Sequence, residues 1–188
     1  MNRNIILPCF FLAFFISCSQ SPKQDLAANQ KDKKYSIDSL INKERRLIAM
    51  AKIKGQQAIG AMPEDEKLVE TIYNIFKDEN GQIIYIAEIP KSPDDDWFIA
   101  YKSYFDENGN LFAFQRQNNF FHSECTKGAA LENLVKYYND KFEVVDSIYT
   151  LTDSYKKDLN KAGCKFPYNF PYSVYKSVAE YRKNIKGL

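Results

Sequence analysis

The chain has 188 residues and a formal net charge of +2, with 45% hydrophobic and 27% charged residues. This near-neutral balance gives no electrostatic argument for a nucleic-acid partner. The chain is long enough for one domain with its own hydrophobic core. Tyr and Phe are abundant and Gly is scarce, which is typical of a protein rich in antiparallel strands.

The first twenty residues contain a single charged side chain, Arg3, followed by an apolar run from Ile5 to Ile16. This run is too short for a membrane-spanning helix, which needs about 20 apolar residues. Its length and flanking residues are those of the apolar region of a secretory signal peptide. The N-terminus therefore predicts export.

The run ends in Phe15-Ile16-Ser17-Cys18, which resembles the lipobox of bacterial lipoproteins. The resemblance implies that residues 1–17 are a signal peptide, removed by cleavage before Cys18. It also implies that acyl chains such as palmitate anchor Cys18, and two or more chains hold a protein stably on a membrane. Ser19 follows where Asp often marks inner-membrane retention, so the resemblance implies a lipid-anchored envelope protein at the outer membrane.

Residues 18–34 are polar, lack aromatic side chains and show no apolar periodicity. Such a composition is typical of a flexible linker. We therefore expect residues 18–34 to be a lipidated cysteine and its tether, followed by a single domain over 35–188.

The domain begins with a predicted helix over 37–54. Ser36 is a plausible N-cap, and Gly55 comes directly after the predicted helix. Apolar residues recur between them at helical spacing, with Lys, Arg and Glu in the gaps. The members of this stripe are Ile37, Leu40, Ile41, Leu47, Ile48 and Ala51.

A weak internal repeat in the middle of the chain predicts β-hairpins. The sequence Asp-Glu-Asn-Gly occurs at 78–81 and again at 106–109, each time between apolar runs. Asn-Gly in this setting is a strong hairpin signal, because both residues tolerate positive φ. A poorer third copy turns at Asn139-Asp140. Three hairpins give six expected strands, near 67–77, 82–90, 96–105, 110–121, 129–138 and 142–152.

Residues 129–138 also fit a helical period, but we favour a strand because it matches the other two hairpins. Near the C-terminus, Val174, Val178, Tyr181 and Ile185 recur at helical spacing and predict a closing helix. The expected fold is therefore α+β, with an N-terminal amphipathic helix, a six-stranded antiparallel meander and a C-terminal helix. The repeat loosely resembles the hairpin repeats of MORN-like or antitoxin-type β-meander proteins. The MORN glycine pattern is absent, so the resemblance implies no function.

Two cysteines remain once Cys9 leaves with the signal peptide and Cys18 carries lipid. In an exported domain, Cys125 and Cys164 most simply form one disulfide. This bond would close a loop of about 40 residues, which contributes roughly 4 kcal/mol in the chain-entropy model. The alternative is a metal site made of Cys125, His122 and Glu124, whose spacing matches no standard zinc pattern.

Strand alternation places aromatic side chains on both faces of the predicted sheet. An antiparallel sheet normally presents one polar face to water, so the second apolar face is either covered or binds a partner. The alternative is that these rings fill a curved sheet and cover one another. The residues we take as a candidate binding surface are Trp97, Phe98, Tyr101, Tyr104, Phe112 and Phe114.

No motif for catalysis, a cofactor or a metal stands out. His122 is the only histidine, and no Gly-x-Ser-x-Gly or phosphate-binding loop accompanies it. The leading hypothesis is a non-enzymatic, lipid-anchored envelope protein that binds another protein. A carrier or sensor of an apolar ligand in a curled sheet, and an envelope hydrolase using His122 or a carboxylate pair, are the alternatives.

Overall fold

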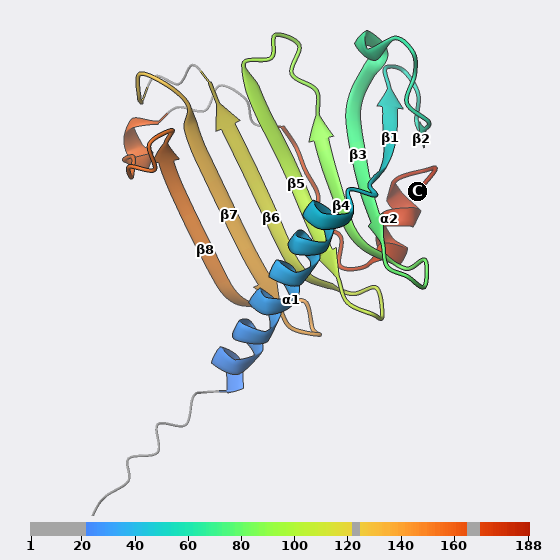
Figure 1. Ribbon diagram of the computed structural model, residues 1–188, viewed down its shortest axis with the longest axis horizontal. Coiled ribbons are helices and arrows are strands. Elements are labelled where there is room, and N and C mark those ends of the chain that lie inside the picture. Colours follow the sequence, from blue (N-terminus) through green and yellow to red (C-terminus); the bar gives the residue numbers. More distant parts are fainter. Residues whose placement is uncertain (1–21, 122–124, 165–169) are drawn as a thin grey trace, which may run out of the picture.

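The computed structural model describes residues 22–121, 125–164 and 170–188. They form one antiparallel eight-stranded sheet with the strand order β2-β1-β3-β4-β5-β6-β7-β8, and two helices (Figure 1). The strands are β1 (Ile48–Ile53), β2 (Ile59–Gly60), β3 (Val69–Lys77), β4 (Ile83–Pro90), β5 (Trp97–Phe105), β6 (Leu111–Phe120), β7 (Ala130–Tyr138) and β8 (Val144–Asp153). The helices are α1 (Pro22–Glu44) and α2 (Val178–Asn184), and short 3-10 turns occur at Glu66–Leu68 and Lys161–Gly163.

The expected α+β class is confirmed, and β3 to β8 are the six strands that the repeat predicts. Residues 130–138 form a strand and not a helix. The predicted number of strands is wrong, because β1 and β2 extend the sheet beyond β3.

The repeated hairpin turns share one hydrogen-bond pattern. The side-chain oxygen of Asp78 accepts from the backbone N–H groups of Asn80 and Gln82. Asp106 makes the same two bonds in the second hairpin, and Asn139 in the third. A side chain that bonds its own turn in this way fixes the loop locally. The sequence therefore folds these hairpins through an Asx turn.

Only one residue in each turn has a positive φ. It is Gly81 in the first hairpin (78°) and Gly109 in the second (76°). In the third hairpin Phe142 takes this conformation, with φ 62°, and its ring stacks on Tyr138 at 4.7 Å. The Asn residues of these turns tolerate positive φ but do not use it here, because the turn needs the left-handed conformation only at its last position.

A β-bulge follows the second hairpin turn and reverses one side chain. Tyr104 pairs with Ala113 while Phe105 pairs with Leu111, so Phe112 is the extra residue. A bulge of this kind breaks the strict alternation of faces. Phe112 therefore lies on the face opposite Phe114, although simple alternation puts both on the same side.

The predicted N-terminal helix is wrong in position. α1 covers Pro22–Glu44, so most of the segment expected to be a flexible tether is helical. Ser36, the expected N-cap, lies inside α1, where its hydroxyl donates to the Asp32 carbonyl at 2.9 Å. The helix ends before Arg45, whose φ is 52°.

The second half of the predicted helix is strand β1. Its apolar residues fit the alternation of a strand as well as the spacing of a helix. Met50 pairs with Tyr73, and Ala51 pairs with Ile72. Pairing with β3 satisfies the backbone of this segment and buries Ala51 completely. Tertiary pairing thus overrides a helical pattern of modest strength.

The C-terminal helix is present but short. Ser177 caps α2 by accepting from the Glu180 N–H, and the Glu180 carboxylate accepts from the Lys176 N–H. The segment is tied to the second hairpin, because the Val178 N–H donates to the Gly109 carbonyl at 2.9 Å. The chain end therefore docks on the repeated turn.

The two ends of the chain cover opposite faces of the sheet (Figure 1). We call them the α1 face and the C-terminal face. On the α1 face, Ile37 packs on a cluster that includes Phe76, Tyr85, Tyr104 and Phe112. On the C-terminal face, Val178 and Tyr181 pack with Ile86, Phe105 and Phe114. Each face thus has its own core.

The expected disulfide between Cys125 and Cys164 is present. It joins the loop before β7 to the segment that leads to the C-terminal cover. Across residues 22–121, 125–164 and 170–188, neither helix has the length and apolar character needed to cross a bilayer.

Gly187 offers a test of how the chain end docks. Its φ is 93°, and an added Cβ would overlap the Ile59 carbonyl oxygen. We expect Gly187→Ala to lower the free energy of unfolding, measured with urea, by at least about 2 kcal/mol. Gly81→Ala is the matched control, because Gly81 also has positive φ but open space around it; it should lose only about 1 kcal/mol. Equal losses in the two variants would contradict the close contact at Ile59.

Candidate functional site

The aromatic residues on the C-terminal face are covered by the chain end. Trp97 lies 4.9 Å from the ring of Phe170 between centroids. Tyr172 stacks on Tyr101 at 4.5 Å and on Phe114 at 5.6 Å. All three sheet residues are buried. These rings hold the C-terminal segment on the sheet.

The aromatic residues on the α1 face are divided. Tyr104 and Phe112 are buried near α1, within the cluster that contains Ile37. Phe98 is only half-buried and lies further along the same face. The two chain ends thus cover five of the six residues of the predicted aromatic surface, and Phe98 is its only half-buried member. Of the two alternatives for the second apolar face, a cover is the one that the structure shows for these five residues.

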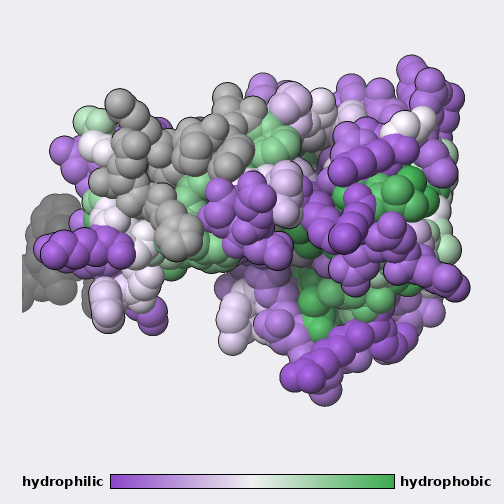
Figure 2. All heavy atoms as spheres, turned by 90° about the horizontal axis from the view of Figure 1, so that it is seen from above, coloured by the Kyte–Doolittle hydropathy of each residue, from purple (hydrophilic) through white to green (hydrophobic). Residues whose placement is uncertain are grey.

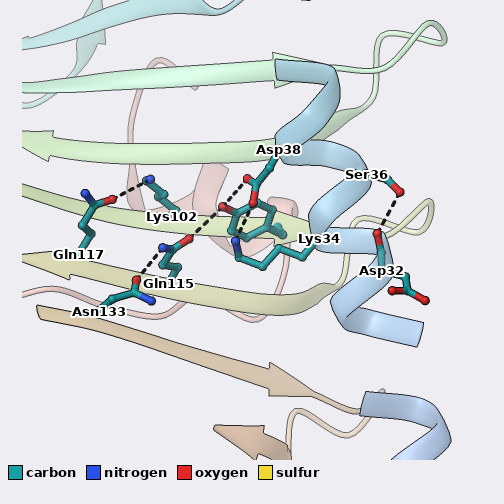
Figure 3. Close-up of polar contacts among 9 residues, drawn as sticks. Asp32, Lys34, Ser36, Asp38, Lys102, Gln115, Gln117 and Asn133 are labelled. Carbon is teal, nitrogen blue, oxygen red and sulfur yellow. Dashed lines mark hydrogen bonds and ion pairs between the residues drawn. The ribbon is translucent and has the colours of Figure 1, made fainter. Parts of the chain in front are cut away.

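A polar network crosses the boundary between α1 and the sheet (Figure 3). The Tyr104 hydroxyl lies 2.9 Å from Asp38 Oδ1 and 3.2 Å from Gln115 Oε1. Lys34 Nζ lies 2.8 Å from Asp38 Oδ2 and 4.6 Å from the centre of the Tyr104 ring. One buried phenol thus connects a helix ion pair to the amide side chains of the sheet.

The network continues on the sheet beyond the helix. Gln115 Nε2 donates to Asn133 Oδ1 at 2.6 Å, and Lys102 Nζ donates to Gln117 Oε1 at 3.0 Å. Figure 3 shows Gln117, Lys102 and Asn133 beside α1 and not beneath it. We call Lys102, Gln115, Gln117 and Asn133 the amide row. They come from the neighbouring strands β5, β6 and β7, and all four are half-buried.

α1 crosses only one end of its face of the sheet. In Figure 1 it lies in front of the end that carries the hairpin turns, and no helix lies in front of the other end. The amide row occupies the middle of this open part. Strand pairing places apolar residues next to it, with Phe98 on β5 and Leu131 on β7. Figure 2 shows the molecule from above, at the end of the sheet away from the repeated hairpin turns, where hydrophobic surface lies among hydrophilic side chains.

Lys102 is the only charged member of the amide row. Burial lowers the pKa of its ammonium group, and the nearby Lys34 lowers it further, while Asp38 raises it. Burial thus makes this ammonium costly to keep without a counter-charge. An acidic group placed over Lys102 would offset that cost.

A second polar cluster is buried on the C-terminal face. The Glu132 carboxylate is 3.0 Å from Arg116 Nη2, 2.7 Å from Asn118 Nδ2 and 3.0 Å from the Tyr149 hydroxyl. Glu132 is only 3% exposed. A buried pair with additional hydrogen bonds is satisfied and costly to break. This cluster joins β6, β7 and β8, and we assign it a structural role.

A third cluster anchors α2. The Tyr181 hydroxyl donates to Glu88 Oε1 at 2.6 Å and lies 3.4 Å from Ser103 Oγ. Burial raises the pKa of the Glu88 carboxyl, although the hydrogen bonds from Tyr181 and Tyr73 act in the opposite direction. A perturbed carboxyl can mark a catalytic site, but here it lies under Tyr181, which is itself completely buried.

The remaining sequence candidates do not assemble into a site within the described residues. Cys125 is bonded to Cys164, so its sulfur is not available as a thiolate ligand in this state. His122 and Glu124 lie outside the described residues, as does Cys18. The described ranges also contain no group of three or more His, Cys, Asp or Glu side chains that could hold a metal ion.

Sequence reasoning missed the amide row. Gln115 and Gln117 share one face of β6 by simple alternation, with Arg116 and Asn118 on the other face, and this alternation was visible in the sequence. What the sequence did not show is which part of the sheet α1 covers. Comparison of the chain with protein-family models, with curated proteins and with solved structures gave no match.

The Glu88 cluster predicts a pH dependence of stability. Because the pKa of Glu88 is raised in the folded protein, its ionised form costs stability once the pH rises above the ordinary value of 4.5 and through the folded pKa. We therefore expect wild type to become more stable relative to Glu88→Gln as the pH falls from 7 towards 4, in urea unfolding experiments. Glu107→Gln, at an exposed turn, controls for the loss of a carboxylate. A difference between wild type and Glu88→Gln that does not change with pH would refute the assignment.

Proposed function

We propose that this chain is a lipid-anchored protein of the cell envelope without enzymatic activity. Its anchor is the acylated Cys18, at the outer membrane, and its folded domain binds another protein. The resemblance of Phe15-Ile16-Ser17-Cys18 to a lipobox supports the anchor. The partner surface is the open part of the α1 face, with the amide row in its middle.

One observation carries the choice of surface: half-buried polar side chains, three amides on β6 and β7 and Lys102 on β5, lie beside α1 and are not covered by it. Each amide group both donates and accepts hydrogen bonds, so the amide row suits the peptide groups of a protein segment. Phe98 and Leu131 beside it supply apolar contact. Lys102 favours a partner segment that carries an Asp or Glu side chain, because the two opposite charges would compensate one another on contact.

The lipid anchor has a direct test with a matched control. Cys18→Ser removes the thiol that would be acylated, whereas Cys9→Ser changes only the predicted signal peptide. We expect labelled palmitate to enter wild type and Cys9→Ser, and not Cys18→Ser. The Cys18→Ser protein should also leave the membrane fraction. Equal labelling of the two variants would rule out anchoring at Cys18.

The binding surface can be tested in cells with a photo-reactive amino acid. Placed at Gln117 or Asn133, it should give a discrete protein adduct on irradiation, whereas the same group at the exposed Lys183 on α2 should give none. Lys102→Glu should reduce the adduct at Gln117 by at least tenfold, because it puts a like charge opposite the acidic partner segment. Lys77→Glu, at an exposed position at the end of β3, is the charge control. Adducts of equal yield at Lys183, or none at either sheet position, would contradict the proposal.

A further inference from the structure

The outer edge of β8 is an open strand edge. β8 is the last strand of the sheet, with β7 on its inner side. On the outer side, Leu151 O accepts from the Leu159 N–H and the Asp153 N–H donates to Lys157 O, each at 2.9 Å. This short return covers only the end of β8. Within the described residues, no strand pairs with the outer side of Val144–Thr150.

The backbone groups on this open stretch point outward at alternate residues. The bonds of Leu151 and Asp153 show that odd-numbered residues face outward, so Ser147 and Tyr149 do so too. The Ser147 N–H agrees with this, because it donates to Asp146 Oδ1 at 2.8 Å and not to β7. An edge of this kind is a template for another strand.

Exposed apolar side chains gather on the same strand. Val144, Ile148 and Tyr149 are each about two-fifths exposed, and Tyr155 in the following turn is 91% exposed. The usual protections of an edge, a lysine or a proline, are absent from the sequence of β8. Its early bulge opposite Tyr138 leaves the stretch from Asp146 onwards regular.

The charge on this edge is already balanced within the chain. Asp146 is the only ionised side chain of β8 before Asp153. Its carboxylate lies 2.7 Å from Lys31 Nζ of α1. Two identical edges can therefore approach each other without an unpaired like charge, which makes the edge compatible with itself.

The other edge of the sheet is much shorter. β2 has two residues, and its Ile59 N–H already donates to Lys186 O of the chain end at 2.8 Å. Pairing of β8 with the β2 edge of another molecule would build an open-ended row of sheets. The β2 edge has few backbone groups for such pairing. Pairing of β8 with β8 about a twofold axis closes after two copies.

We propose that β8 pairs antiparallel with β8 of a second copy of this chain, so that the two sheets join edge to edge. The contact uses the outward backbone groups of Ser147 and Tyr149, and the Ser147 N–H exchanges its acceptor Asp146 Oδ1 for a carbonyl of the second copy. It also buries Ile148 on the α1 face of the joined sheet. The amide row lies on β5 to β7 of each copy, away from this edge, so dimer formation leaves both binding surfaces open.

Sedimentation velocity of the full-length chain tests this proposal, in detergent whose micelles are matched in density by the buffer. Wild type should show a concentration-dependent equilibrium between monomer and dimer. Ile148→Lys places a charge in the contact, and Ser147→Pro removes an N–H that is not bonded to β7. Each variant should weaken dimerisation at least tenfold, with an unchanged circular dichroism spectrum.

Leu68→Lys is the matched control, because it changes an equally exposed apolar residue at the other end of the sheet. It should dimerise like wild type. If Ser147→Pro fails to fold, Ile148→Lys still decides, since its side chain is on the surface. A wild-type chain that stays monomeric at every concentration would overturn the proposal. Dimerisation that is unaffected by Ile148→Lys would also overturn it, as would oligomers larger than a dimer whose size increases with concentration.

Discussion

The central constraint on this protein is that its sheet is apolar on both faces. Tyr104 and Ile99 lie on the same strand, β5, point to opposite faces of the sheet, and are both buried. A sheet of this kind cannot leave either face to water, so each face needs a cover. The chain supplies both covers from its own ends, with α1 on one face and the segment from Phe170 to the C-terminus on the other (Figure 1).

The two covers are held by different chemistry, and this difference shapes the surface. The C-terminal segment packs through rings, with Tyr172 stacked between Tyr101 and Phe114. α1 relies more on polar contacts: Gln30 donates to the Tyr138 carbonyl, and Lys31 pairs with Asp146. Because α1 crosses only one end of the sheet, the polar network that starts at Asp38 runs on through Gln115 to Asn133, beside the helix and without a cover. The proposed binding surface thus continues the polar network that holds α1 on the sheet.

The hairpins were predictable because the residues that determine each turn lie next to one another in the sequence. Asp106 and Gly109 sit within one turn, and that turn needs only a side-chain acceptor and one positive φ. α1 was not predictable in its first half, because its buried positions there are Ala27 and Gln30, which produce no apolar period. The face of Phe112 depends on a bulge set by the neighbouring strand, and the burial of Trp97 depends on a segment more than 70 residues away in sequence. Both features depend on tertiary contacts, so they cannot be predicted from the alternation of residues within one strand.

The most direct test of the two-cover account uses Trp97, the only tryptophan of the chain. It is 3% exposed, on the sheet face that Phe170 covers. The measurement is its fluorescence emission and its quenching by acrylamide in the native full-length chain. The account predicts a blue-shifted emission with strong protection from the quencher, both lost on unfolding in urea. Emission and quenching in the native chain like those of the unfolded chain would contradict it, since the C-terminal segment would then not cover the sheet.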